Sequence, residues 1–212
     1  MGNIKNMKLT KYEQSGFIFE AENGFRLAFD IGNKTLLERL EGVRVDAMLV
    51  SHIHGDHFSL EQIKKLSPKK LFLNRECNET LGEEVLPFES QIVKVGDTIK
   101  IDDIEVVFFN VEHGPNVSSP LIENFGFLIK SDGETIYFAG DMFYESGIEV
   151  KELEVDYALL PVGTFYTFGP QEALDFAKKF KRIGEIIPMH YEKTPETRTQ
   201  FIELAKEFFV IK

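Results

Sequence analysis

The segment His52-Ile53-His54-Gly55-Asp56-His57 packs four imidazole and carboxylate side chains into six residues. It follows the apolar run 45–50, which has the pattern of a buried strand. In extended backbone the first two histidines lie on the same side, and Gly55 permits a tight turn that brings the last two side chains to a second position. Without a metal ion, imidazoles this close would compete for hydrogen-bond partners. The segment therefore predicts a strand-end loop that binds metal ions and can supply ligands to two of them.

Three further candidate ligands also follow predicted strands. The chain has five histidines, and the two outside the loop, His113 and His190, each follow an apolar run. Asp141 follows Tyr137-Phe138-Ala139-Gly140. Taken singly, a histidine at a strand end is usually an ordinary surface residue, and a Gly-Asp pair is usually a turn. Because α/β scaffolds build sites from loops at several strand ends, we expect these three residues to complete the metal site.

Strand and helix patterns alternate along the chain. A hairpin is predicted across residues 15–30, where apolar residues alternate on both sides of a Glu-Asn-Gly turn. Further strands are expected at 45–50, 70–74, in several segments of 91–113, and at 125–130, 135–139, 155–162 and 183–188; helices are expected at 34–40, from Ser59 to Pro68, at 170–180 and at 195–208. No linker or repeat interrupts this order, so we expect one α/β domain spanning 1–212, with mixed sheets covered by helices.

Composition limits the partners and the compartment. The formal net charge is −11, which opposes binding to nucleic acid or to an anionic membrane. No run approaches the roughly 18 to 20 apolar residues of a membrane helix, and the first residues lack a hydrophobic signal core. Cys77 is the only cysteine, which excludes an internal disulfide or a thiolate-rich zinc site. We expect a cytoplasmic protein with a small-molecule substrate; the oligomeric state stays open.

These residues, in their order and approximate spacing, resemble the motifs of the metallo-β-lactamase superfamily along residues 8–209. The segments Pro161-Val162-Gly163-Thr164 and Pro188-Met189-His190-Tyr191 are similar to the branch that contains ascorbate-6-phosphate lactonase. The resemblance implies an αββα sandwich with the site at the edge between two mixed sheets. It also implies the ligand set: His52, His54 and His113 for one metal, Asp56, His57 and His190 for the other, and Asp141 bridging both.

The implied activity is hydrolysis by a metal-bridging hydroxide, which attacks a small-molecule carbonyl or a phosphodiester. Two divalent ions are expected, zinc first, with manganese or iron as alternatives. The catalytic candidates are Asp56, which would orient the hydroxide and shuttle its proton, and the bridging Asp141. Positions expected to support the pocket are Asp30, Ser51, Tyr144, Thr164 and Tyr166.

Two other activities remain open within this resemblance. Redox members of the superfamily with a di-iron site carry glutamate where this chain has His54, and are usually joined to an electron-carrying domain. Nucleases use the same ligands but add an inserted domain or a basic arm. The chain also departs from the narrower branch at Gln14-Ser15-Gly16, at Ile31 and at Met142. These positions lie next to the expected metals, so the departures bear on the substrate rather than on the ligand set.

Overall fold

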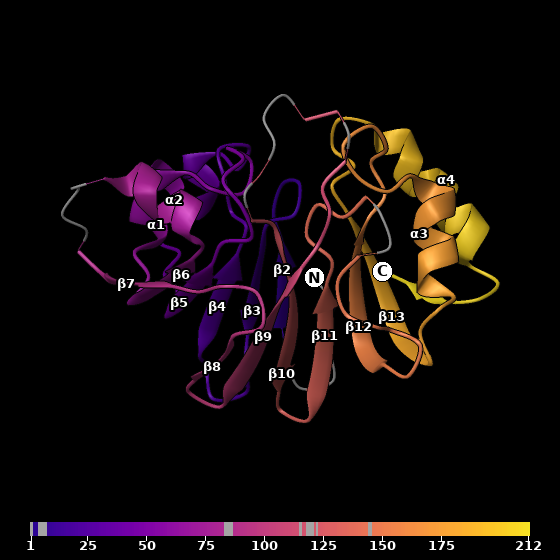
Figure 1. The fold of residues 1–212 in the computed structure, drawn as a ribbon, viewed down its shortest axis with the longest axis horizontal. Helices are drawn as coiled ribbons and strands as arrows, with labels where there is room; N and C mark the ends of the chain where they lie inside the picture. Colours follow the sequence, from indigo (N-terminus) through magenta and orange to yellow (C-terminus); the bar gives the residue numbers. More distant parts are fainter. Residues whose placement is uncertain are drawn as a thin grey trace. The chain divides into compact units, whose positions relative to one another are not determined.

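The structure is a computed structural model that describes residues 2–3, 8–82, 87–114, 116–117, 121, 123–143 and 146–212 (Figure 1). It divides into two compact units, residues 1–94 and 95–212. Each unit contains one seven-stranded sheet. That residues 1–212 act as a single metallo-hydrolase domain stays a prediction.

The first unit is a mixed sheet with two helices on one face. Its strands lie in chain order: β1 (Gly2–Asn3), β2 (Lys8–Lys11), β3 (Phe17–Glu20), β4 (Arg26–Phe29), β5 (Ala47–Leu49), β6 (Lys70–Leu73) and β7 (Glu89–Ile92). Strands β1 to β4 pair antiparallel, and β4 to β7 pair parallel. Helices α1 (Leu60–Leu66) and α2 (Arg75–Leu81) form the crossovers between the last three strands. A short 3-10 helix, Leu37–Leu40, lies between β4 and β5.

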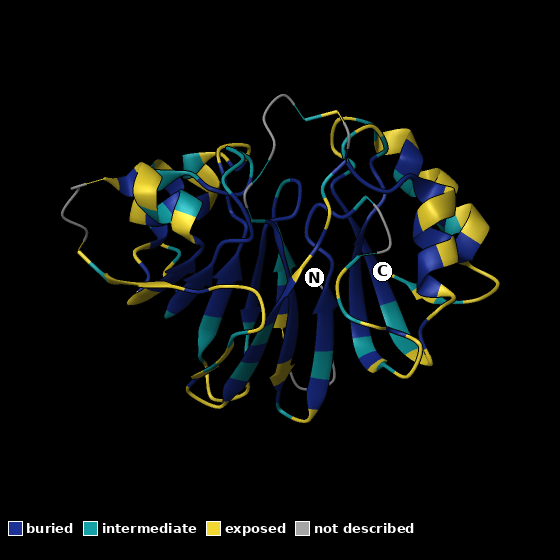
Figure 2. Ribbon diagram, in the orientation of Figure 1, coloured by how far each residue is buried: buried dark blue, intermediate teal, exposed yellow. Residues whose placement is uncertain are grey.

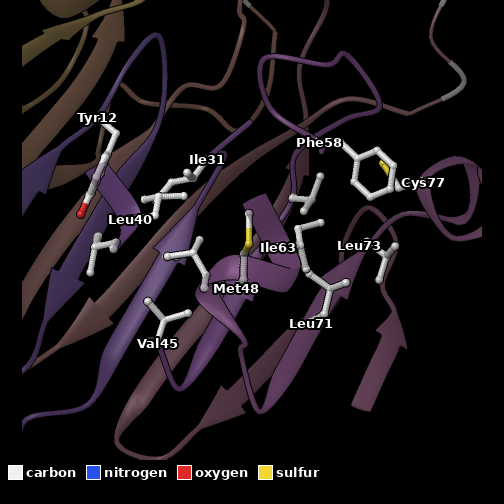
Figure 3. Close-up of a cluster of buried hydrophobic side chains, with 14 of the residues drawn as sticks. Tyr12, Ile31, Leu40, Val45, Met48, Phe58, Ile63, Leu71, Leu73 and Cys77 are labelled. Carbon is white, nitrogen blue, oxygen red and sulfur yellow. The ribbon is translucent and has the colours of Figure 1, made fainter. Parts of the chain in front are cut away.

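The core of the first unit joins these helices to the sheet (Figure 3). Ile63 of α1 and Cys77 of α2 are fully buried against Met48 and Leu71 of the sheet. Phe58, which directly follows His57, belongs to the same cluster. The predicted metal loop is therefore anchored to the core at its C-terminal end, because displacing Phe58 would expose a large apolar ring to water.

The second unit repeats the plan of the first. Its strands also lie in chain order: β8 (Thr98–Ile101), β9 (Ile104–Asn110), β10 (Phe125–Ser131), β11 (Glu134–Phe138), β12 (Glu154–Pro161), β13 (Arg182–Met189) and β14 (Val210–Ile211). Strands β8 to β11 pair antiparallel, and β11 to β14 pair parallel. Helices α3 (Pro170–Ala177) and α4 (Pro195–Ala205) connect the parallel strands.

Aromatic rings fill the core of the second unit. In the sheet, Phe138 stacks on Phe127 with ring centroids 5.3 Å apart, and Phe108 meets Phe127 edge to face at 5.4 Å. Tyr137 is fully buried, and its ring lies 6.0 Å from that of Phe176 on α3. Figure 2 shows the consequence: the central strands of the second unit are buried over most of their length, with exposed and half-buried residues towards one end, while α3 and α4 each keep an exposed outer face.

The structure corrects three local predictions. Residues 34–40 form only the 3-10 helix Leu37–Leu40. Helix α2 was not predicted, because its sequence carries few apolar residues at helical spacing; it buries Cys77, which is thus a structural cysteine. Ser59 does precede α1, but its hydroxyl bonds the Gln62 side chain instead of capping the helix backbone. Within the described residues, no helix has the length and apolar character needed to cross a membrane.

Candidate metal centre

The expected ligands of the first unit lie at the carboxyl end of one parallel strand, and Asp30, which was expected to support the pocket, lies at the carboxyl end of the strand beside it. The segment from Ser51 to His57 follows β5, and Asp30 follows β4. His52 and His57 are fully buried, whereas His54 and Asp56 are partly buried. The carboxyl edge of a parallel sheet is where α/β folds place their ligands, since the loops there are supported by rigid strands.

The loop brings its three imidazoles together. The ring centroids of His52 and His54 are 4.7 Å apart, and those of His52 and His57 are 4.1 Å apart. The backbone N–H of His57 donates to the carbonyl of His54 at 2.9 Å, which closes the turn. A Cβ on Gly55 would lie 2.6 Å from the amide nitrogen of the exposed Asn33 side chain, which would have to move aside.

The Asp30 carboxylate holds this loop through hydrogen bonds to Ser51 and His57. Its carboxylate accepts the Ser51 N–H at 2.8 Å and the Ser51 hydroxyl at 2.5 Å, and it lies 2.8 Å from Nδ1 of His57. The Ser51 hydroxyl also lies 2.8 Å from Nδ1 of His52. Both rings thus use Nδ1 within the protein, so Nε2 is the nitrogen that each can offer to a metal. Asp30 is fully buried and has a φ of 51°, a strained backbone conformation that this network maintains.

Asp30, His52 and His57 form a compact group whose ligand atoms all lie within 4.8 Å of one another. The Asp30 carboxylate already accepts three hydrogen bonds, so we interpret it as a residue that orients the two imidazoles and not as a metal ligand. The Ser51 hydroxyl, which is bonded to Asp30, orients the His52 ring in turn. Both residues were expected to support the pocket, and the structure shows how they contact the ligands.

Gln14 contacts the metal loop in a way that the sequence did not predict. Its side-chain amide donates to Oδ2 of Asp56 at 3.2 Å, although 42 residues separate the two. Gln14 is buried and has a φ of 55°. In the sequence it stood out only as a departure from the lactonase branch, since no local pattern connects it with the metal loop.

The expected ligands of the second unit lie near three strand ends: His113 follows β9, Asp141 follows β11 and His190 follows β13. Oδ2 of Asp141 is 3.4 Å from Nε2 of His113 and 3.0 Å from Nε2 of His190. The three side chains are at most 5% exposed. One carboxylate oxygen thus lies close to both imidazoles.

These separations fit metal ligands. Two atoms bound to one zinc at about 2.0–2.1 Å in tetrahedral geometry lie about 3.3 Å apart. The donor set of imidazole nitrogens and carboxylate oxygens suits zinc, manganese or iron. The Cys77 thiol is not part of this donor set, because it is buried on the core helix α2. The residues therefore fit the divalent ions that the sequence predicts.

Close backbone packing holds His190 in place. This residue has a φ of 56°, and a Cβ on Gly163 would lie 1.8 Å from its carbonyl oxygen. Thr194, which precedes α4, donates its hydroxyl to the Gly163 carbonyl at 2.7 Å. Next to His190, burial and the nearby Glu192 carboxylate raise the pKa of Tyr191.

The remaining pocket candidates differ in what the structure shows. Thr164 has a φ of 57°, and its hydroxyl donates to the Gly163 carbonyl at 2.6 Å. Tyr166 accepts the Gly114 N–H with its backbone carbonyl at 3.1 Å, beside His113. Tyr144 lies outside the described residues.

Comparison with known proteins identifies the family. A family model described as "Beta-lactamase superfamily domain" matches residues 8–190. A UPF0173 metal-dependent hydrolase of Pyrobaculum neutrophilum is 30% identical over 203 residues, which cover 91% of this chain and 87% of that protein.

Solved structures show the same fold. Igni18, a metallo hydrolase from Ignicoccus hospitalis, has a TM-score of 0.77 at 24% identity, with 97% of this chain and 94% of that chain covered. CmlA, a diiron β-hydroxylase from Streptomyces venezuelae, has a TM-score of 0.73 at 12% identity, with 97% and 52% covered.

These likenesses confirm the predicted fold class, α/β with two mixed sheets and covering helices. The narrower resemblance to the lactonase branch stays a prediction. The chain belongs to the metallo-β-lactamase superfamily and is one of its metal-dependent hydrolases.

Proposed function

We propose that this chain is a dinuclear hydrolase of small molecules, in which both units supply ligands to one pair of divalent ions, zinc first. The assignment is the one that the family implies: His52, His54 and His113 bind one ion, Asp56, His57 and His190 bind the other, and Asp141 binds both. The observation that carries it is the position of Asp141 Oδ2, 3.4 Å from His113 Nε2 and 3.0 Å from His190 Nε2. A bridging carboxylate has to approach one ligand of each ion in this way.

The metal pair would supply Lewis acidity and lower the pKa of a shared water enough to give hydroxide near neutral pH. This leaves specific tasks to the side chains. Asp56 orients the attacking water and takes its proton, while Gln14 holds one oxygen of that carboxylate in place. Asp30 and Ser51 keep His52 and His57 in the tautomer that exposes Nε2. No serine or cysteine nucleophile is required.

The bond attacked is a carbonyl, as in a lactone, amide or thioester, or a phosphodiester. The charge of −11 favours a small substrate over nucleic acid, because a polyanion would be repelled. The likeness to the diiron hydroxylase extends to the fold alone at 12% identity. His54, where the redox members carry glutamate, favours hydrolysis. A cytoplasmic location stays a prediction.

The test uses protein reconstituted with zinc, manganese or iron and a panel of lactones, thioesters, amides, β-lactams and phosphodiesters, with a short RNA as the polyanion. We expect turnover of at least one small substrate and none of the RNA. Asp56→Asn should lower kcat, whereas Asp46→Asn, which removes a carboxylate at the opposite end of β5, should not. Selective turnover of RNA would show a nuclease instead. Oxygen consumption in the iron-loaded protein without hydrolysis would show a redox protein.

A further inference from the structure

The loop after β12, residues 162–168, is hydrogen-bonded to the segments that carry two of the second unit's expected ligands and packs against the third. The Tyr166 carbonyl accepts the N–H of Gly114, next to His113. The Phe168 N–H donates to the carbonyl of Met142, next to Asp141, at 2.9 Å. Gly163 packs against the His190 carbonyl. The backbone of this loop is therefore held to the segments that carry the expected metal ligands.

Phe165 is the exposed ring of that loop. From Pro161 to Pro170 every residue is buried except Thr164, Phe165 and Tyr166, and the Phe165 side chain is 60% exposed. Thr164 and Phe165 have φ values of 57° and 62°. Two successive non-glycine residues in this region are uncommon, and a β-branched threonine there is an outlier. Such strain persists where the surrounding structure imposes it, and it concentrates at ligand-binding sites. The Asn116 amide, which donates to the Phe165 carbonyl, contributes to that constraint.

The Phe165 and Tyr166 rings form a pair, and Lys193 lies near it. The rings of Phe165 and Tyr166 meet edge to face, with centroids 4.7 Å apart. Nζ of Lys193, three residues after His190, lies 5.3 Å from the Tyr166 ring centroid. The neighbouring carboxylate of Glu192 accepts the Tyr191 N–H at 3.2 Å. An exposed aromatic ring and an exposed lysine thus lie on segments that adjoin the predicted metal ligands in the chain or by hydrogen bonds, in a protein whose overall charge is negative.

We propose that Phe165 and Lys193 select the substrate, which is a small organic anion with a planar apolar group. The group next to the scissile bond stacks on Phe165, and a negative charge on its far side pairs with Lys193. This inference rests on the proposed function in one respect: it takes the metal centre as the place where the substrate binds. The stacking and the ion pair are separable contributions, because one depends on the ring and the other on the charge.

The chain contains a matched pair of control residues. Phe208 is 57% exposed, and its ring lies 3.8 Å from Nζ of Lys178. This pair also combines an exposed phenylalanine with a lysine in the second unit. Lys178 directly follows α3, before β13, and Phe208 lies between the end of α4 and the start of β14. Both therefore lie near the amino ends of parallel strands, at the edge opposite the ligands.

The test measures equilibrium binding of three probes to the zinc-loaded protein: acetate, benzoate and benzene-1,4-dicarboxylate. One carboxylate of each probe occupies the metals, the ring reports on Phe165, and the second carboxylate reports on Lys193. We expect benzoate to bind about fivefold more tightly than acetate, and the dicarboxylate to gain a further factor of about two to five. Phe165→Ala should remove the first gain and Phe165→Tyr should keep it, while Lys193→Met should remove only the second.

Phe208→Ala and Lys178→Met should keep both gains. Equal binding of acetate and benzoate by the wild-type protein would overturn the proposal. Equal losses in the Phe165 and Phe208 variants would do the same. Because these constants do not depend on turnover, protein that binds the probes as expected but hydrolyses no substrate would refute the proposed function and leave the preferred ligand class standing.

Discussion

The two units of the chain share a strand plan and differ in how they present their ligands. In each, antiparallel strands lead into parallel strands joined by two helices. Each also has an aspartate that accepts a backbone N–H from the preceding strand: Asp46 from Arg26 at 3.0 Å, and Asp156 from Thr135 at 2.9 Å. Each of these aspartates pairs with a cation at the start of the next parallel strand, Lys69 or Arg182.

The two units differ at the sheet edges where the expected ligands lie, at the carboxyl ends of their parallel strands. The first unit concentrates four expected ligands on the loop after β5 and orients two of them through the buried Asp30. The second unit takes one ligand from each of three segments, and the loop 162–168 connects those segments. The same fold plan thus supports two kinds of half-site: the backbone packs closely in both, but only the first is also organised by a buried carboxylate network. Substitutions should affect the two differently.

Replacing a ligand should have the largest effect. Asp141→Ala removes the oxygen that both His113 and His190 approach. We expect metal affinity to fall by more than about 100-fold, beyond the range for partners that only orient ligands. Metal content after dialysis, measured by plasma mass spectrometry, should drop for both ions. Unchanged metal content would show that Asp141 is not a shared ligand.

Asp30→Asn should have the next largest effect, about 10- to 100-fold in metal affinity. Asparagine tolerates the φ of 51°, but its amide cannot accept all three hydrogen bonds that the carboxylate accepts. A competition titration with a zinc chelator measures the change. Asp46→Asn is the matched control, since that aspartate lies at the other end of β5. If both variants bound zinc as the wild type does, the carboxylate network would have no part in the site.

Gly163→Ala and Gly32→Ala test the backbone packing of the two half-sites. A Cβ on Gly163 would lie 1.8 Å from the His190 carbonyl oxygen, and one on Gly32 would lie 2.2 Å from the Asp56 carbonyl carbon. Neither overlap can be relieved without moving the backbone, so we expect a loss of about 1–3 kcal/mol in the free energy of unfolding. Urea denaturation measures it. Wild-type stability in both variants would contradict the packing described here.

The two half-sites also differ in how well the sequence predicts their ligands. The ligand loop after β5 is evident from local spacing alone, because its four side chains fall within six residues. His113, Asp141 and His190 needed the family resemblance as well, since each is a single residue at a strand end. Thr164 and Tyr166 were expected to support the pocket, and Gln14 stood out as a departure from the narrower branch, but the contacts that Gln14 and the loop 162–168 make were not predicted. Their contacts join residues far apart in the chain, and no periodicity or motif records such contacts.

We expect the smallest effect at Asp46, one of the two aspartates that accept a backbone N–H and pair with a cation. Burial tends to raise the pKa of Asp46, but the Lys69 ammonium and the Arg26 N–H outweigh it and lower this pKa below its usual 3.8. The stabilisation is therefore present above about pH 4 and lost as the pH falls through the folded-state pKa. Wild type should be slightly more stable than Asp46→Asn at pH 7, and the difference should vanish in acid. The effect is small because the Lys69 side chain is 79% exposed. A difference that persists at pH 2 would contradict it.

The central claim is that the two half-sites bind one pair of metal ions. X-ray absorption spectroscopy of protein loaded with two equivalents of zinc tests it most directly, because scattering from a neighbouring metal reports the distance between the ions. We predict a metal–metal distance of about 3.5–4 Å, with nitrogen and oxygen neighbours only, and its loss in Asp141→Ala. Wild-type protein that binds no more than one equivalent, or two ions without mutual scattering, would contradict the account.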